Sequence, residues 1–164
     1  MLAVGDRVVY PSYGAGIIEA IEEHEVLGER HRYYVLTIPY GSMKVMIPLE
    51  KVETIGLREV IPEVEVPKVV EILSSPPGHN NVNWNRRFHL NLTKVKSGCI
   101  YEVAEVVKNL TLQDRLKRLS TGERRLLETA KQILISELVL VCGKDVHSTE
   151  IWINGLFPEN TPGN

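Results

Sequence analysis

The stretch that decides the fold of the first third of the chain is V4-GDRVVYPSYGAGIIEAI-21. It holds a short run rich in Val and Tyr at residues 6–10 and opens a longer apolar run at 16–26, with PSYGAG between them. β-branched and aromatic residues bounded by Pro, Gly and Ser are typical of antiparallel strands joined by a tight turn. The stretch therefore predicts a β-hairpin at the start of the protein.

The same strand pattern continues to about residue 47. Two more runs, at 31–38 and 43–47, are rich in Val, Ile and Tyr, and LGER and PYGS supply the turns between the runs. Pro48 ends the last clear strand. Four or five short strands within about 60 residues indicate a small antiparallel barrel of the Tudor or SH3 kind.

The glycines at 14 and 16 do not indicate a phosphate-binding loop. The letters YGAG lead into a predicted strand instead of a helix, and no Lys-Ser or Lys-Thr follows them. Phosphate loops need a helix N-terminus to hold the anion. We interpret the two glycines as residues that shape a turn.

A domain boundary is predicted near residue 60. The segment 56–67, GLREVIPEVEVP, brings two prolines and a cluster of glutamates. Beyond it the spacing of apolar residues changes from a period of 2 towards 3.6. We therefore expect an α+β protein with segregated parts, an antiparallel β domain at 1–60 and an all-helical domain at 61–164.

Helix signals recur through the second domain. Val69, Val70 and Leu73 predict a first helix that SSPPG ends at 74–78, and Asn83 is a suitable N-cap for a second helix to about residue 96. A third helix is expected at 100–119, a short one at 148–154 and a frayed tail at 158–164.

The fourth helix has the clearest signals at both of its ends. Ser120 and Glu123 have the spacing of a capping box, and Gly143 is a suitable stop. Between them, one face stays apolar at the helical period. Its residues are Leu127, Ala130, Leu134, Leu138 and Val141.

Composition predicts a globular cytoplasmic protein. The chain has 164 residues, is 43% hydrophobic and holds two cysteines without a CxxC spacing, which favours neither a disulfide framework nor a zinc site. No secretory signal or apolar segment of the ~20 residues that span a bilayer is present. We expect no membrane association.

The residues that usually carry catalysis show no site spacing. The five histidines form neither HxxxH nor HExxH, and no serine or cysteine lies in a GxSxG elbow. We therefore expect no catalytic residues, no cofactor and no metal, and treat an enzyme of unrecognised type as the least favoured class.

Basic charge is concentrated in one segment, although the net charge is −2. Residues 72–101 contain no Asp or Glu and four fixed cations, and a tryptophan lies among them in NWNRRFHLNLTKVKSG. On a helix that Asn83 caps, one side carries Arg86, Arg87, Leu90, Thr93 and Lys94, and the other carries Trp84, Phe88, Leu92 and Val95.

Two interpretations of Trp84 remain open from the residues. The apolar spacing favours a core residue. The position at the first turn of the helix, beside arginines, favours a displayed ring that stacks on an unpaired base while the cations neutralise phosphates. Likewise, Arg86 and Arg87 are either a solvated face or phosphate contacts.

The whole pattern resembles the CarD/CdnL family of bacterial transcription regulators. The similarity rests on VGDRVVYPSYGAGIIEAI, YYVLTIP, VMIPLE, NWNRRFHLNLTKVKSG, AEVVKNL and KQILISELVL, and it runs to about residue 141. The first motif is also similar to the polymerase-interacting domain of the transcription-repair coupling factor. The chain is too short to hold that protein's motor.

The resemblance implies a regulator that stabilises the open promoter complex. Its Tudor-like domain would add a strand to the β subunit of RNA polymerase, and its helical domain would reach promoter DNA at the upstream edge of the bubble. DNA contact would be weak and largely independent of sequence, and polymerase would hold the protein on the nucleoid. The rival hypothesis is a protein-interaction adaptor that makes no DNA contact, in which the Tudor-like domain binds a partner and Trp84 fills the helical core.

The resemblance also assigns residues. Trp84 would be the wedge, with a basic patch around it, and His24 and Met46 stand where some relatives carry arginines. The implied DNA-binding residues are Trp84, Arg86, Arg87, His89 and Lys94, and the implied polymerase-binding residues are His24, Met43, Val45, Met46 and Ile47.

Overall fold

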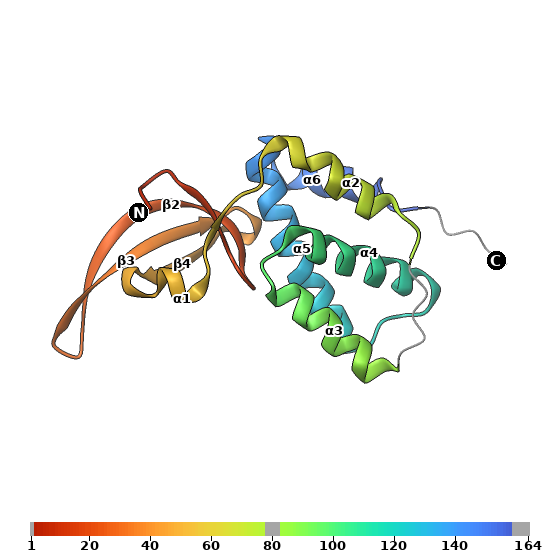
Figure 1. Ribbon diagram of the computed structural model, residues 1–164, viewed down its shortest axis with the longest axis horizontal. Helices are drawn as coiled ribbons and strands as arrows, with labels where there is room; N and C mark the ends of the chain where they lie inside the picture. The colour runs from red at the N-terminus through yellow and green to blue at the C-terminus, as the bar shows by residue number, and fades with distance from the viewer. Residues whose placement is uncertain (1, 78–82, 159–164) are drawn as a thin grey trace.

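Five strands form one antiparallel sheet in the first third of the chain (Figure 1). The computed structural model describes residues 2–77 and 83–158. The strand order is β4-β3-β2-β1-β5, so β4 and β5 are the two edges of the sheet. The strands are β1 (Arg7–Tyr10), β2 (Gly14–Val26), β3 (Glu29–Ile38), β4 (Met43–Pro48) and β5 (Arg58–Glu59).

The predicted strands are confirmed, with ends that move by up to two residues. One segment was not predicted: after β4 the chain forms two short helical turns, η2 (Leu49–Lys51) and α1 (Val52–Ile55), before β5. These turns place apolar side chains against one face of the sheet. The core of the domain contains Val8, Ile18, Tyr34, Leu36, Ile38 and Ile47.

The β2–β3 hairpin projects from this domain. β4 pairs with β3 only between Tyr33 and Ile38, whereas β2 and β3 continue together to the turn after Val26. The outer part of the hairpin is therefore a two-stranded ribbon, which extends away from the helices in Figure 1.

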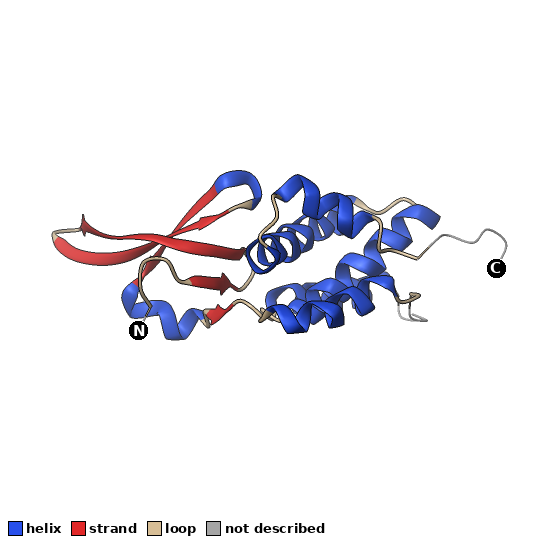
Figure 2. Ribbon diagram, turned by 90° about the horizontal axis from the view of Figure 1, so that it is seen from above, coloured by secondary structure: helices blue, strands red, loops and turns tan. Residues whose placement is uncertain are grey.

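The rest of the described chain is helical, as predicted for an α+β protein with segregated parts (Figure 2). A turn, η3 (Glu63–Glu65), leads into five helices. They are α2 (Val66–Ser74), α3 (Trp84–Lys96), α4 (Ile100–Leu116), α5 (Thr121–Cys142) and α6 (Val146–Asn154). The last strand ends at Glu59 and the first long helix begins at Val66, so the domain boundary near residue 60 stays a prediction that these bounds permit.

Helix ends follow the sequence signals in most cases. Asn83 accepts a hydrogen bond from the backbone of Arg86, and Gly143 ends α5 in the left-handed conformation. The third helix is three residues shorter than predicted. Lys117 is extended, and the N–H of Leu119 bonds instead to the Asp114 side chain.

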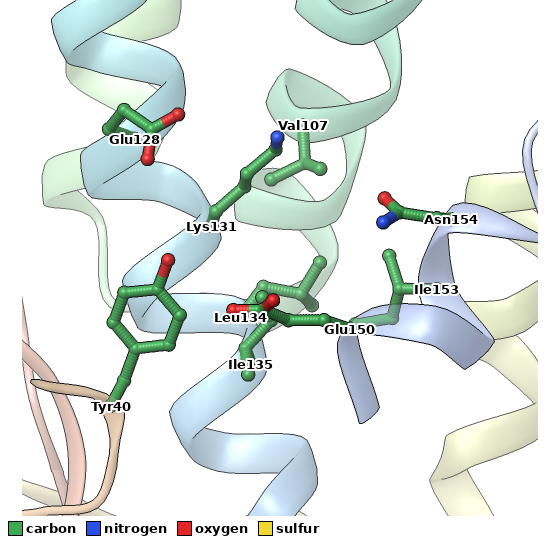
Figure 3. Close-up of a pocket in the computed structure, with 9 residues that line it drawn as sticks. All are labelled: Tyr40, Val107, Glu128, Lys131, Leu134, Ile135, Glu150, Ile153 and Asn154. Carbon is green, nitrogen blue, oxygen red and sulfur yellow. The ribbon is translucent and has the colours of Figure 1, made fainter. Parts of the chain in front are cut away.

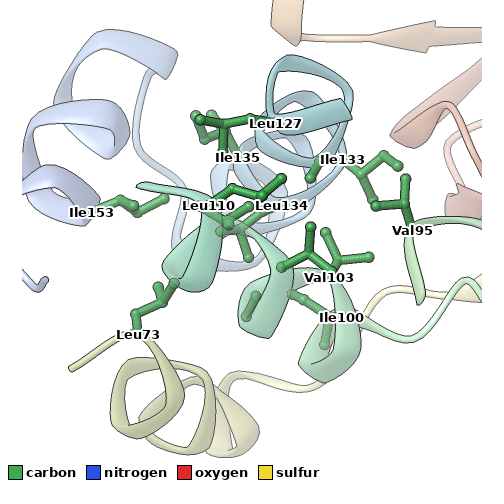
Figure 4. Packing of buried hydrophobic residues seen from close by; sticks show 14 of the residues in the cluster. Leu73, Val95, Ile100, Val103, Leu110, Leu127, Ile133, Leu134, Ile135 and Ile153 are labelled. Carbon is green, nitrogen blue, oxygen red and sulfur yellow. The ribbon is translucent and has the colours of Figure 1, made fainter. Parts of the chain in front are cut away.

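One hydrophobic core joins the helices (Figure 4). The buried positions of α4 and α5 recur at the helical period and meet side chains from α2, α3 and α6. The predicted face of α5 is buried at Leu127, Ala130, Leu134 and Leu138, whereas Val141 is only half-buried. No helix in the described part of the chain is long and apolar enough to cross a membrane.

The two domains pack through the start of β2 and the middle of α5. Gly14 has a φ of +126°, and a Cβ there would lie 2.6 Å from the Ser136 hydroxyl, so only glycine fits. The same hydroxyl accepts a 2.8 Å bond from the Ala15 N–H. Arg58 forms a two-pronged ion pair, at 2.7 and 2.9 Å, with the fully buried Glu137. The sheet and helices therefore have a defined relative position.

Candidate functional site

Three helix ends meet at the end of the helical domain that lies away from the sheet (Figures 1 and 2). They are the beginnings of α3 and α5 and the end of α4. We call their surface the distal face. It is formed by Trp84, Arg86, Arg87, Leu116, Lys117, Arg118, Ser120 and Glu123.

Trp84 is displayed on this face. The residue is 44% exposed, and its ring stacks on Phe88, with 5.5 Å between ring centroids and 13° between ring planes. The residues of α3 that pack on the helical core are Phe88, Leu92 and Val95. The interpretation of Trp84 as a core residue is therefore wrong: its indole extends the stripe of those residues past the end of the core.

A buried carboxylate orients the exposed indole. Trp84 Nε1 donates a 2.8 Å hydrogen bond to Oε1 of Glu123, which is only 2% exposed. The predicted capping box is partly formed, because Ser120 accepts from the Glu123 N–H at 3.2 Å. The glutamate side chain is directed towards Trp84 and also accepts longer bonds from Arg87 and Gln113.

The predicted basic patch divides into paired and exposed cations. Arg87 lies 3.4 Å from Glu123, and Lys94 forms a 3.0 Å ion pair with Glu105 on α4. Arg86 and His89 are exposed, and within the described ranges neither forms an ion pair. Arg86 is thus the predicted cation best placed to meet a phosphate without first leaving a partner.

A second basic segment lies beside Trp84. Residues 115–125 contain five Lys or Arg and one acid, and that acid is the buried Glu123. The sequence prediction missed this segment because it concentrated on 72–101, although the run RLKRLSTGERR carries the signal. All five cations are exposed: Arg115, Lys117, Arg118, Arg124 and Arg125.

A pocket of about 640 Å³ opens on the distal face between Trp84 and the end of α4. Its apolar lining includes Leu112 and Leu116, and its polar lining includes Asn91 and Asn109. Arg87, Lys117 and Arg118 also lie around it. The pocket therefore combines an aromatic wall, apolar surface, amide groups and positive charge.

The predicted polymerase-binding residues lie on and near the edge strand β4. Met43 and Val45 pack towards the core of the sheet, and Ile47 is fully buried, so the Ile47 side chain cannot touch a partner. Met46 is 44% exposed. His24 lies on β2, where its ring bonds to Glu22 at 2.9 Å.

Met46 and His24 point to the same side of the sheet. Met46 lies opposite Val35 and His24 opposite His31. Positions 31 and 35 on one strand share a face, so their partners share it too. This face is opposite to the one that covers the domain core. A partner at β4 would meet Met46 directly, whereas His24 lies on β2, two strands farther in.

A smaller pocket of about 200 Å³ lies between the domains (Figure 3). Tyr40, from the turn η1 (Tyr40–Ser42) before β4, points towards Glu128 and Lys131 on α5, and Glu150 approaches from α6. Burial, followed by the charges of Glu150 and Glu128, raises the pKa of the Tyr40 hydroxyl. The acidic residues that line this pocket, and its position at the domain contact, make the pocket unsuited to bind a polyanion.

Residues 2–77 and 83–158 contain no cluster of three or more His, Cys, Asp or Glu arranged to hold a metal ion. The chemistry that the distal face offers is stacking, hydrogen bonding and charge neutralisation.

Comparison with known proteins identifies relatives of both domains. Residues 2–61 match the family model "CarD-like/TRCF RID domain", and residues 68–154 match "CarD, C-terminal domain". The putative transcription factor YdeB of Bacillus subtilis (strain 168) is 38% identical over 143 residues, which cover 87% of this chain and 94% of that protein. Among solved structures, the solution NMR structure of the 72-residue N-terminal domain of Myxococcus xanthus CarD matches this chain with 41% sequence identity. That match covers 36% of this chain and 79% of the other, with a TM-score of 0.31.

Proposed function

This chain belongs to the CarD family, and is thus a transcription regulator that interacts with RNA polymerase; we propose that it stabilises the open promoter complex with Trp84. In this proposal the sheet domain docks on the polymerase β subunit, and the distal face meets promoter DNA at the upstream edge of the bubble. The protein then acts in the cytoplasm, on the nucleoid, wherever polymerase holds it.

The edge strand β4 supports docking by strand addition. Its inner side pairs with β3, and no described strand pairs with its outer side. An unpaired strand edge presents backbone N–H and C=O groups that another strand can bind. Met46, exposed beside that edge, adds apolar contact. His24 and Met46 leave this contact less positively charged than arginines would.

The charge of the distal face supports a DNA contact that depends on tethering. A few phosphate contacts give free affinities of the order of 10⁻⁴ to 10⁻⁶ M at physiological salt. Docking on polymerase instead presents DNA at an effective concentration that reaches the millimolar range. Weak contacts then suffice, and because phosphates and stacking carry little base information, sequence preference is slight.

The single observation that carries the proposal is the geometry of Trp84. An exposed indole that a buried carboxylate already holds in place has little freedom left to lose on binding, so its contact energy is retained. Stacking on one unpaired base contributes about 1–3 kcal/mol, which would raise the open-complex equilibrium roughly 5- to 150-fold. The adaptor hypothesis required Trp84 to fill the core, and the exposed ring gives it no support.

Site-specific crosslinking tests whether the distal face meets DNA. A photoreactive phenylalanine analogue replaces Trp84 in one variant and Trp152, the other tryptophan, in the matched control. With polymerase and promoter present, we expect DNA crosslinks at the upstream bubble edge from position 84 and none from position 152. Crosslinks from position 84 to protein alone would favour the adaptor.

A further inference from the structure

We propose that the pocket beside Trp84 is a binding site for one unpaired nucleobase, extruded from the DNA at the bubble edge. The proposal rests on the function inferred above and extends it, because stacking on a wedge needs only the surface of a ring, whereas capture needs a cavity. At about 640 Å³, the pocket is in the ordinary size range of small-molecule sites, roughly 300–1,000 Å³.

The lining of the pocket suits a flat heterocycle. Trp84 lines one side, and Leu116, 73% exposed at the end of α4, lines the pocket with it. The buried Leu112 and Leu119 supply further apolar surface. A base has apolar faces and polar edges, so enzymes that extrude bases hold them between apolar walls and bind their edges with polar groups.

One residue that lines the pocket carries a polar atom without a partner. Oδ1 of Asn109, on α4, is buried and lacks a hydrogen-bond partner in the described structure. A buried acceptor without a donor is costly, and native proteins rarely leave one unexplained. Every natural base carries an N–H donor on its edge, and a side-chain amide can both accept from and donate to such an edge. Asn91 adds a second buried amide to the lining.

The charges in and around the pocket favour a phosphate outside it and a neutral base inside it. Lys117 and Arg118 are exposed, where phosphate oxygens can reach them from solvent. Glu123 is buried in the lining and carries the negative end of the Trp84 contact. Its carboxylate repels a phosphate from the interior but not a neutral base. The arrangement thus favours a nucleotide whose base enters and whose backbone stays outside.

The test compares open-complex lifetimes on promoters that lack one base. An abasic site replaces the first unpaired position at the upstream bubble edge, on each strand in turn, and lifetimes are divided by those without the protein. We expect wild type to extend the lifetime on the intact promoter. On one of the two abasic templates that extension should fall about fivefold, the value of one hydrogen bond plus part of a stack.

The variant Asn109→Leu removes the amide at similar volume. Because the Asn109 Oδ1 atom has no partner to lose, the variant should melt no lower than wild type. On the intact promoter it should lose most of the base-dependent extension, and removing the base should then cost it little more. Leu116→Ala, a surface change at the pocket wall, should show the same pattern. Thr111→Val is the matched control: its hydroxyl, also on α4, is buried and without a partner but does not line the pocket.

The two failures are distinguishable. If the losses from Asn109→Leu and from the abasic site multiply, the pocket binds no base and stacking on the Trp84 ring accounts for the base dependence. If wild type extends the lifetime equally on intact and abasic templates, neither the pocket nor the ring uses that base, and only the stabilisation of the open complex stands. If wild type does not extend the lifetime on the intact promoter, the proposed function fails and the pocket proposal fails with it.

Discussion

The indole Nε1 of Trp84 donates a 2.8 Å hydrogen bond to Oε1 of Glu123, which joins the first residue of α3 to the first turn of α5. The donor belongs to an exposed side chain and the acceptor to a buried one. A negative charge beside a DNA contact would by itself weaken that contact. Its presence is explained if Glu123 orients the ring, since a carboxylate accepts a stronger hydrogen bond than a neutral group does.

Replacement of Glu123 tests that orienting role. Glu123→Ala removes the acceptor for Trp84 and leaves Gln113 and Arg87 without their partner, so we expect a loss of about 2–3 kcal/mol in the free energy of unfolding. In a Trp152→Phe background, the fluorescence anisotropy of Trp84 should also fall because its ring moves more freely. Glu128→Ala, an exposed change on the same helix, should alter stability by less than about 0.5 kcal/mol. Unchanged anisotropy in Glu123→Ala would show that stacking on Phe88 alone fixes the ring.

The contact between the domains should depend on Glu137. This fully buried carboxylate accepts two bonds from Arg58 and a third, at 2.8 Å, from the Ile61 N–H. Glu137→Ala should cost about 3 kcal/mol and increase the radius of gyration in small-angle scattering, because the sheet loses its main polar anchor on α5. Arg58→Lys keeps the positive charge but cannot donate two parallel hydrogen bonds to one carboxylate, so the loss in the free energy of unfolding should be smaller. A Glu137→Ala protein with wild-type scattering would mean that apolar packing alone holds the domains.

Tyr101 predicts a change of stability at alkaline pH. Its hydroxyl donates a 2.7 Å bond to Glu65, and that bond, followed by burial, raises the pKa of Tyr101 from 10.0 to about 12. The protonated form is therefore favoured in the folded state. Its stabilising contribution is complete below the unfolded pKa, near pH 10, and is lost as the pH rises towards 12.

Spectroscopic titration measures this effect. We expect the tyrosinate absorbance of the folded protein to include a component near pH 12 that Tyr101→Phe removes. Glu65→Gln should move that component towards lower pH, because it replaces the charged acceptor. If the component near pH 12 survives in Tyr101→Phe, another tyrosine is responsible for it.

The basic segment after α4 should contribute to DNA binding. Replacing Lys117 and Arg118 by Ala should weaken binding of the polymerase-bound protein to upstream DNA about equally on different promoters. It should also flatten the salt dependence, by about 0.9 in the log–log slope for each phosphate that the variant no longer neutralises. Lys144→Ala, which removes an exposed cation elsewhere, should leave the slope unchanged. Weakening confined to one promoter would indicate base readout instead.

The sequence predicted the helices well where local chemistry decides their ends. Asn83 and Ser120 cap α3 and α5, and Gly143 ends α5, because each of these residues satisfies backbone groups within its own turn. The turn α1 and the strand β5 were not predicted. Both are very short, and β5 forms only by pairing with β1.

The candidate site was only half predictable for a related reason. Trp84 and Arg86 lie in one helical turn, so their sequence pattern identified them. Lys117 and Arg118 reach the same face only because the end of α4 lies beside the beginnings of α3 and α5. The Glu123 side chain is directed towards Trp84 by a tertiary contact, which a capping-box pattern does not contain. Similarly, the strand pattern at 43–47 did not indicate that Ile47 faces the core.

The central claim is that Trp84 holds the promoter open, and open-complex lifetime measures it most directly. Polymerase on a weakly melted promoter is compared without the protein, with wild type and with Trp84→Ala, while Trp152→Phe serves as the control and polymerase binding is measured alongside. We predict that wild type and Trp152→Phe lengthen the lifetime severalfold and that Trp84→Ala loses most of this effect while still binding polymerase. If Trp84→Ala binds polymerase and lengthens the lifetime as much as wild type does, Trp84 is not the wedge.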